Sequence, residues 1–298
     1  MRYRGRVIFP PPLRPGDRIA IVAPSGPFDR AAALRGIAWL ENRYRVSYRQ
    51  SLFDRAGYLA GSDARRTDEL QRALDSDVCA VVAARGGYGL SRIAHAVDWK
   101  RAVARPRWIV GFSDVTVLHV EAWRRGLASA HAPMVCSLGL ATEAARRRWV
   151  AALERPLDER EWKGLARWRR GRAAGTLVGG NLAILHACAA ASRLRIPKGA
   201  VVFLEDIGER PYRVDRMLTN LVTGGHLATA SGFVVGGFTD CEPGPDRTTV
   251  EEALRERLRT LRVPVVAGLP AGHGPRNDAL IFGRRAELDA ERGTFRLF

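Results

Sequence analysis

The chain lacks any apolar run long enough to cross a membrane. A spanning helix needs about 20 consecutive apolar residues, and every apolar run in this sequence is shorter than that. The basic N-terminus resembles the start of a secretory signal, but only Val7, Ile8 and Phe9 follow before three prolines end the run. We therefore expect a soluble, cytoplasmic protein with no membrane partner.

Cysteine is also scarce, with four in 298 residues. They lie far apart, share no spacing typical of metal ligands, and mostly fall in apolar runs, where cysteine behaves as a small hydrophobe: Cys79, Cys136, Cys188 and Cys241. This pattern argues against a disulfide-stapled scaffold. We expect a reducing compartment and no structural metal.

Lysine is nearly absent, since only three of the 48 basic residues are lysine, although the formal net charge is +17. Such a charge can indicate a nucleic-acid partner, because clustered cations release counterions from phosphates. The arginines, however, are spread through segments with helix and strand patterns, and acidic residues interrupt the densest basic region, 146–172. We attribute the excess to genome composition and expect no nucleic-acid partner.

Short apolar strands alternate with helical patterns in the first half of the chain, at 18–23, 78–84 and 108–110. This alternation predicts an α/β fold, with a parallel sheet covered by helices on both faces and functional loops at the carboxyl ends of its strands. Glycine-rich strands dominate from about residue 175. We predict an N-terminal α/β domain (1–150) that carries the nucleophile, a basic linker (151–174) and a smaller, strand-rich α/β C-terminal domain (175–298).

A serine stands where one of these strands meets a helix. Ser113 belongs to the motif GFSD (111–114), directly after the apolar strand 108–110 and before a helical pattern. Such a corner exposes the hydroxyl at the end of the sheet, beside the positive end of the helix. The position suits a nucleophile, although a lone Gly-x-Ser is also common in ordinary turns.

Two later residues could complete a charge relay with Ser113 in the order Ser, Glu, His. Glu205 ends the apolar run VVFL, where an ionised carboxylate needs a partner. His273 lies in a glycine-rich loop, from which an imidazole can reach a site. Asp206 and Glu209 fit the acidic role equally well by composition, and the alternative base is His131.

A glycine cluster, RGGYG (85–89), follows the strand at 78–84. Gly86 and Gly87 can present backbone N–H groups to a developing oxyanion, together with the N–H of Asp114. The cluster matches neither the dinucleotide spacing nor the Walker spacing with its lysine. An acyl-transfer site therefore fits better than a nucleotide site, and an ordinary tight turn remains the alternative.

Taken together, these segments resemble the L,D-carboxypeptidase family of serine peptidases, which includes murein tetrapeptide carboxypeptidases and microcin C immunity peptidases. The resemblance implies Ser113 as nucleophile, His273 as general base and acid, and Glu205 as its orienting carboxylate. It also implies an oxyanion hole built from the Gly86–Gly87 turn and Asp114. The matching stretches run in order along nearly the whole chain: LRPGD (13–17), IVAPS (21–25), RGGYG (85–89), GFSD (111–114), GGN (179–181), LED (204–206) and GLPAGH (268–273).

The resemblance implies a cofactor-independent, metal-independent exopeptidase that hydrolyses the amide bond before a C-terminal D-amino acid, as in a murein tetrapeptide. Its partner would be a small peptide with a free C-terminal carboxylate, and members of this kind are usually cytoplasmic homodimers. One alternative is a microcin C-type peptidase acting on aminoacyl or peptidyl nucleotides, in which Trp162 or Trp168 would stack on the nucleotide. Tryptophans beside arginines are more often packing residues. The other alternative is a non-catalytic peptide-binding protein on the same scaffold.

Overall fold

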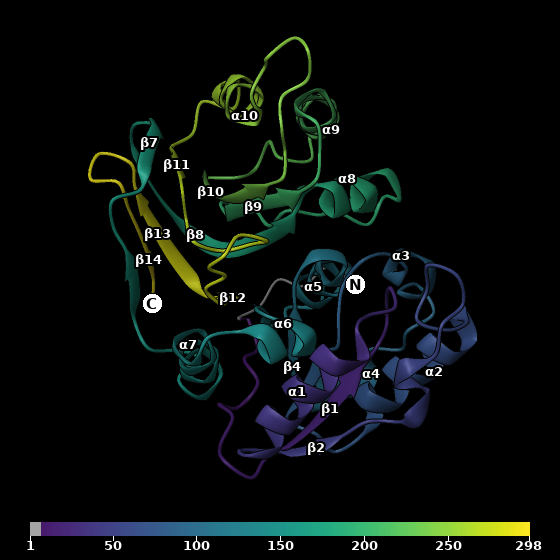
Figure 1. Ribbon diagram of the computed structural model, residues 1–298. Helices are drawn as coiled ribbons and strands as arrows, with labels where there is room; N and C mark the ends of the chain where they lie inside the picture. Colours follow the sequence, from purple (N-terminus) through teal and green to yellow (C-terminus); the bar gives the residue numbers. More distant parts are fainter. Residues whose placement is uncertain (1–6) are drawn as a thin grey trace. The chain divides into compact units, whose positions relative to one another are not determined.

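The computed structural model describes residues 7–298, which form two compact units (Figure 1). Unit 1 comprises the chain up to Pro156 together with Asp278–Ile281. Unit 2 comprises Leu157–Asn277 and Phe282–Phe298. The basic N-terminal residues 1–6, considered above as the start of a signal sequence, lie outside the described residues.

Unit 1 is built on a six-stranded sheet in which β1 to β5 run parallel. The chain passes from β1 to the edge strand β2 and then returns to pair β3 with the other side of β1. Ligand sites in such sheets lie at the carboxyl ends of the strands, where the order reverses, which here is between β1 and β3. In sheet order the strands are β12 (Leu280–Phe282), β5 (Ser129–His131), β4 (Trp108–Gly111), β3 (Ala80–Ala83), β1 (Arg18–Val22) and β2 (Arg45–Ser47).

Helices cover both faces of this sheet because its strands are apolar on both sides. Ile19, Val82 and Trp108 belong to one core with α1, α6 and α7, whereas alternate strand residues such as Val81 face the opposite side. Helix α2 contacts β1, and α5 contacts β4 and β5. The helices are α1 (Arg30–Glu41), α2 (Asp63–Asp75), α3 (Leu90–Ile93), α4 (Lys100–Ala104), α5 (Thr116–Trp123), α6 (Val135–Leu140) and α7 (Glu143–Glu154), with 3₁₀ turns at Gln50–Phe53 and Ser113–Val115.

Unit 2 contains an eight-stranded sheet with a parallel centre, β8 to β11, and antiparallel strands on both sides of it. Figure 1 shows α8 (Leu182–Ala190), α9 (Pro211–Thr223) and α10 (Val250–Arg259) along one side of this sheet. No helix within residues 7–298 has the length and hydropathy of a membrane span. In sheet order the strands are β6 (Arg160–Trp162), β14 (Thr294–Leu297), β13 (Arg285–Asp289), β8 (Arg172–Asn181), β9 (Val201–Ile207), β10 (Gly232–Thr239), β11 (Val265–Ala267) and β7 (Ala166–Arg169).

The predicted fold class, a helix-covered parallel sheet followed by a strand-rich α/β region, is confirmed. The segment 151–174, which sequence analysis treats as a basic linker, contains the end of α7, the strands β6 and β7, and the start of β8. Its Trp162 is buried and stacks on Phe295 of β14 at a centroid distance of 5.6 Å. The basic side chains of this segment therefore belong largely to the folded sheet of unit 2.

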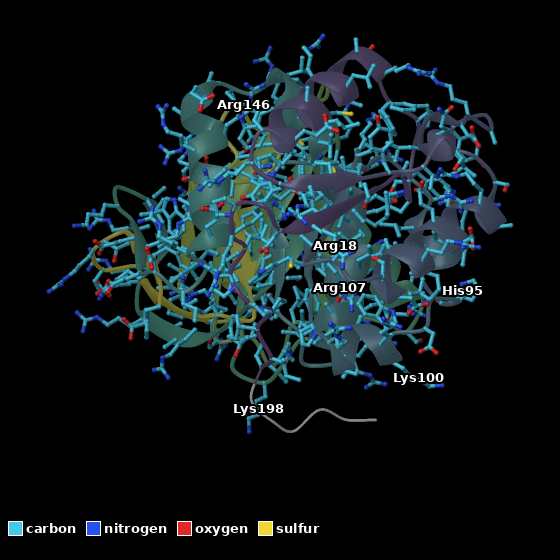
Figure 2. The ribbon with its side chains drawn as sticks, turned by 90° about the horizontal axis from the view of Figure 1, so that it is seen from below. Arg18, His95, Lys100, Arg107, Arg146 and Lys198 are labelled. Atoms are coloured by element: carbon cyan, nitrogen blue, oxygen red, sulfur yellow. The ribbon has the colours of Figure 1, made fainter. Side chains whose placement is uncertain are left out.

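Some of the many arginines connect chain segments through ion pairs and hydrogen bonds. Arg18, at the start of β1, and Arg105 both pair with Asp77, at 2.7 and 2.8 Å. Arg107, labelled close to Arg18 in Figure 2, is buried and donates to the carbonyls of Ser76 and Arg105. Because the guanidinium presents several donors in a fixed plane, one arginine can tie several chain segments together.

Candidate active site

Ser113 lies two residues after the end of β4 and adopts a left-handed backbone conformation, with a φ of 63°. This region favours glycine, and a non-glycine residue held there costs about 1 to 3 kcal/mol. The turn is tight, since a Cβ on Gly111 would lie 2.8 Å from the Val115 side chain. A strained serine between a strand and a helix is the geometry that exposes a nucleophilic hydroxyl at the end of a sheet.

The glycine turn after β3 packs against this serine. A Cβ on Gly86 would lie 2.8 Å from the Ser113 Cβ and 3.0 Å from its Oγ, so only glycine leaves the hydroxyl its space. The same position is 3.3 Å from the backbone nitrogen of Asp114. Gly87 has a φ of 101°, which also requires glycine. The structure thus brings the Gly86–Gly87 turn, Ser113 and the Asp114 amide together within unit 1.

Asp114 contacts the residue that follows the glycine turn. Its side chain is buried, and Oδ2 accepts a hydrogen bond of 2.9 Å from the Leu90 amide, the first residue of α3. Burial raises the pKa of Asp114 to about 6. Its burial therefore costs stability from the ordinary pKa of 3.8 upward, and the cost reaches its full size above about pH 6, because the unfolded chain solvates the charge fully.

Replacing Asp114 with asparagine is expected to stabilise the protein at pH 8. Asparagine keeps an oxygen for the Leu90 amide and removes the buried charge, so the free energy of unfolding should rise by up to about 3 kcal/mol, the equivalent of a shift of about two pKa units. The gain should shrink as the pH falls through 6, because folded Asp114 then becomes protonated, and vanish near pH 4. Urea unfolding at pH 8, 6 and 4 measures it.

The matched control for this prediction is Asp68→Asn, which removes an exposed carboxylate whose pKa is lowered by its hydrogen bond with Arg72. This variant should show no gain at pH 8. A less stable Asp114→Asn variant at pH 8 would show that the carboxylate charge is needed for folding and contradict the expected sign.

His273 and Glu205 form a hydrogen-bonded pair in unit 2. Glu205 lies in β9, is fully buried, and its Oε2 is 2.6 Å from the His273 Nδ1. Since a carboxylate oxygen can only accept, Nδ1 carries the proton in this contact and Nε2 is the basic nitrogen of the neutral ring. This is the tautomer that a general base next to a serine requires.

The loop that carries His273 is shaped by its neighbours. A Cβ on Gly272, whose φ is 110°, would lie 2.8 Å from the Glu205 Oε2, so glycine is required for the imidazole to approach the carboxylate. The Gly272 amide donates to the Asn277 Oδ1 at 3.0 Å. The Gly237 amide, in β10, donates to the Ala271 carbonyl at 2.9 Å. These contacts fix the residues on either side of the ring.

The other two acidic candidates have different partners. Asp206 accepts hydrogen bonds of 2.8 Å from the Asn181 side chain, 2.9 Å from the Ala183 amide and 2.8 Å from the Ile207 amide. It thereby supports the start of α8, and burial raises its pKa to about 6. Glu209 pairs with Arg213 at 3.5 Å. Of the three carboxylates, Glu205 is the one in contact with His273.

The alternative base, His131, ends β5 in unit 1 and is fully buried, with its ring 5.8 Å from that of Phe112. Nearby, His119 is also buried: its Nε2 is 3.0 Å from the Gly111 carbonyl and its Nδ1 is 2.9 Å from the Ser129 hydroxyl. Burial lowers the pKa of His119 to about 4. Both rings are enclosed by the core, which favours structural roles over proton exchange with a substrate.

Ser113 belongs to unit 1, and the Glu205–His273 pair belongs to unit 2. The two tryptophans considered for nucleotide stacking are both in unit 2. Trp162 packs on Phe295, and Trp168 is half-buried beneath the Arg255 guanidinium, 5.0 Å from the ring centroid. Sequence reasoning missed Arg66, a buried arginine on α2 that contacts the glycine turn, because nothing in the charged pattern of that helix distinguishes it.

Comparisons with known proteins match this architecture. Residues 19–132 match the LD-carboxypeptidase N-terminal domain and residues 174–288 the LD-carboxypeptidase C-terminal domain. The murein tetrapeptide carboxypeptidase of Pseudomonas aeruginosa is 32% identical over 294 residues, which cover 92% of this chain and 94% of that protein.

Solved structures agree with these sequence matches. The muramoyltetrapeptide carboxypeptidase from Oxalobacter formigenes aligns with a TM-score of 0.83 at 30% identity, over 94% of this chain and 97% of that one. The microcin C7 self immunity protein MccF, in complex with aspartyl sulfamoyl adenosine, aligns with a TM-score of 0.86 over 97% of this chain and 98% of that one, and its 20% identity shows a shared fold. The resemblance read from the sequence motifs is confirmed, and the chain belongs to the LD-carboxypeptidase family of serine peptidases, which are hydrolases.

Proposed function

We propose that the protein is a serine L,D-carboxypeptidase that removes the C-terminal D-amino acid from murein tetrapeptides through Ser113, His273 and Glu205. The observation that carries this proposal is the 2.6 Å contact between the His273 Nδ1 and the buried Glu205, because it fixes the imidazole tautomer that a serine nucleophile needs. Relatives named as murein tetrapeptide and muramoyltetrapeptide carboxypeptidases support the substrate class. The reaction would serve murein peptide recycling.

The proposed mechanism has two stages. First, the Ser113 Oγ attacks the carbonyl carbon before the terminal D-residue while the His273 Nε2 accepts the hydroxyl proton. The oxyanion forms against the backbone N–H groups of the Gly86–Gly87 turn and Asp114, and His273 returns the proton to the leaving amine. Water, activated by the same imidazole, then releases the acyl group from Ser113. Glu205 stabilises the imidazolium that forms in each stage.

Cleavage of aminoacyl nucleotides is the alternative that shares this chemistry. In that case an aromatic side chain would stack on the nucleotide base, as considered above for Trp162 and Trp168. Trp162 is buried against Phe295, and one face of Trp168 is covered by Arg255. These contacts occupy Trp162 fully and one face of Trp168 in packing within unit 2, which favours the murein peptide as substrate.

The test is an assay of the purified protein on two substrates, a murein tetrapeptide ending in D-alanine and a peptidyl adenylate. We expect release of D-alanine and a tripeptide from the first, at a kcat/KM at least about 100-fold above that on the second, a difference of about 3 kcal/mol in transition-state binding. Mass spectrometry of both products measures it. Exclusive cleavage of the adenylate would replace the proposed substrate but keep the mechanism.

A further inference from the structure

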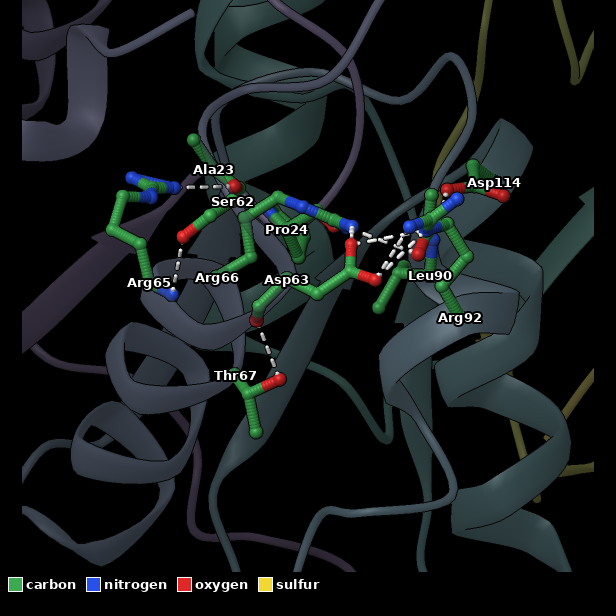
Figure 3. A network of polar contacts seen from close by, with 11 residues as sticks. Ala23, Pro24, Ser62, Asp63, Arg65, Arg66, Thr67, Leu90, Arg92 and Asp114 are labelled. Carbon is green, nitrogen blue, oxygen red and sulfur yellow. Dashed lines mark hydrogen bonds and ion pairs between the residues drawn. The ribbon is translucent and has the colours of Figure 1, made fainter. Parts of the chain in front are cut away.

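A fully buried arginine connects the two loops at the switch point of unit 1 (Figure 3). Arg66, on α2, is 0% exposed. Its Nη1 donates to the carbonyl of Pro24, in the loop after β1, and to the carbonyl of Gly89 at 2.9 Å, at the end of the glycine turn after β3. Its Nη2 donates to Asp63, the first residue of the same helix. One guanidinium thus ties α2 to both loops.

A second arginine supports the first through the same carboxylate. Asp63 accepts hydrogen bonds of 2.7 to 3.0 Å from the Nε and Nη2 of Arg92, on α3. Helix α3 starts directly after the glycine turn. Asp63 therefore links Arg66, which contacts the turn, to Arg92, which lies on the helix after the turn. Figure 3 shows the two guanidinium groups converging on Asp63.

The glycine turn is therefore held at both ends. At its start, the Gly26 amide donates to the Gly86 carbonyl at 3.0 Å, and the Cys136 amide donates to the Ala84 carbonyl at 3.0 Å. At its end, Arg66 contacts the Gly89 carbonyl, and Asp114 accepts from the amide that follows. Gly86 is itself one of these anchored residues, and Gly87 lies between it and Gly89. Glycines lose more conformational freedom on folding than any other residue, so such a turn depends on external contacts for its shape.

The contact between Arg66 and the turn is close. A Cβ on Gly89, whose φ is 136°, would lie 2.6 Å from the Arg66 Nη1, so the backbone approaches the guanidinium as only glycine allows. Lysine could not replace these contacts, since an ammonium on a flexible stem does not present parallel donors to two carbonyls and a carboxylate.

We infer that Arg66 is a positioning residue for catalysis: it sets the Gly86–Gly87 turn against Ser113, so that the backbone donors meet the oxyanion. The inference rests on the function proposed above. Oxyanion donors act only at about 2.7 to 3.1 Å from the developing charge, and losing one costs about 100- to 1,000-fold in kcat. A shift of the turn by about 1 Å should have an effect of the same order. Substrate binding, which does not depend on this alignment, should change little.

Steady-state kinetics of Arg66→Lys and Arg66→Met test the inference, with Arg72→Met as the matched control. Arg72 lies on the same helix, is 68% exposed and pairs only with Asp68 in the described chain. We expect kcat on the tetrapeptide to fall about 30- to 300-fold in both Arg66 variants, with KM within about threefold of the wild type, as for an interaction made in the transition state. Arg72→Met should keep the wild-type kcat.

Asp63→Asn provides a second variant in case a substitution at the buried Arg66 prevents folding. Asp63 is 39% exposed, and its loss should weaken the Arg66 contacts and lower kcat about 3- to 10-fold by removing a charge-assisted partner. Circular dichroism establishes that each variant is folded. The inference would be overturned by a wild-type kcat in a folded Arg66→Met variant, or in both Arg66→Lys and Asp63→Asn. A fall in kcat in Arg72→Met as large as that in the Arg66 variants would also overturn it.

Labelling of Ser113 by a fluorophosphonate separates this inference from the proposed substrate. If the wild type is labelled but does not cleave murein tetrapeptides, the proposed substrate is wrong. The labelling rate then tests the inference in place of kcat, and we expect it to fall about 10-fold or more in Arg66→Lys. If the labelling rate is unchanged, the inference is wrong. A wild-type protein that is neither active nor labelled would overturn both.

Discussion

Replacing Ser113 with alanine is expected to lower kcat by about 10⁴-fold or more while the protein stays folded. The variant removes the nucleophile, and in serine hydrolases the oxyanion hole and substrate binding alone retain only a small part of the rate enhancement. Alanine at a φ of 63° is strained in the same way as serine, so stability should change little. Release of D-alanine from the tetrapeptide measures the effect.

The matched control is Ser192→Ala. Ser192 also has a left-handed backbone, with a φ of 56°, but it lies exposed after α8, away from the candidate residues of unit 2. It should keep full activity, which shows that replacing a serine in this backbone conformation does not itself affect turnover. Mass spectrometry should find a covalent adduct on Ser113 in the wild type. Full turnover by Ser113→Ala would eliminate this residue as the nucleophile.

Replacing Glu205 with glutamine should lower kcat by about 10³- to 10⁴-fold, close to the effect of the same kind of change in other serine triads. Glutamine has the shape of glutamate, but it cannot stabilise an imidazolium by charge. Its amide can also turn a donor towards the His273 Nδ1, which would favour the tautomer with the proton on Nε2. That nitrogen could then no longer accept the Ser113 proton.

The control for this prediction is Glu209→Gln, because Glu209 lies near the end of the same strand but pairs with Arg213. We expect this variant to remain within about twofold of the wild-type kcat, since the Glu209–Arg213 pair is partly exposed and does not include His273. A Glu205→Gln variant that loses less than 10-fold would show that His273 is oriented by other contacts, and the charge relay would then need a different carboxylate.

Sequence patterns predict the first half of the chain well because its strands are buried on both faces. The apolar runs that become β1, β3 and β4 fit only a strand or a buried helix segment, and the turn residues after each run mark the loops where the sequence predicts a site. Ser113 is therefore visible from the sequence as the hydroxyl at a strand–helix corner.

The region from 151 to 174 is harder to predict for the opposite reason. The strand β7, with sequence ARWR, is half-exposed and charged, and it lies at the edge of its sheet. Short edge strands of this kind carry little hydrophobic periodicity, so a linker is the natural interpretation. The return of Asp278–Ile281 to unit 1 depends on strand pairing between distant segments, which local patterns do not encode.

The choice between Glu205 and Asp206 also needed the structure. Neighbouring residues on a strand point to opposite faces of the sheet, so only one of the two can meet His273. Composition cannot tell which. The pairing of β8 with β9 sets Asn181 opposite Glu205, and the Asn181 side chain bonds Asp206, which commits Asp206 to the start of α8.

One anchor of the glycine turn changes its charge in mild acid. Burial raises the pKa of Asp114 to about 6, so its carboxylate takes up a proton below that pH. The neutral carboxyl group keeps an oxygen that can accept the hydrogen bond from the Leu90 amide. Mild acid should therefore remove the charge at this end of the turn and leave the attachment in place.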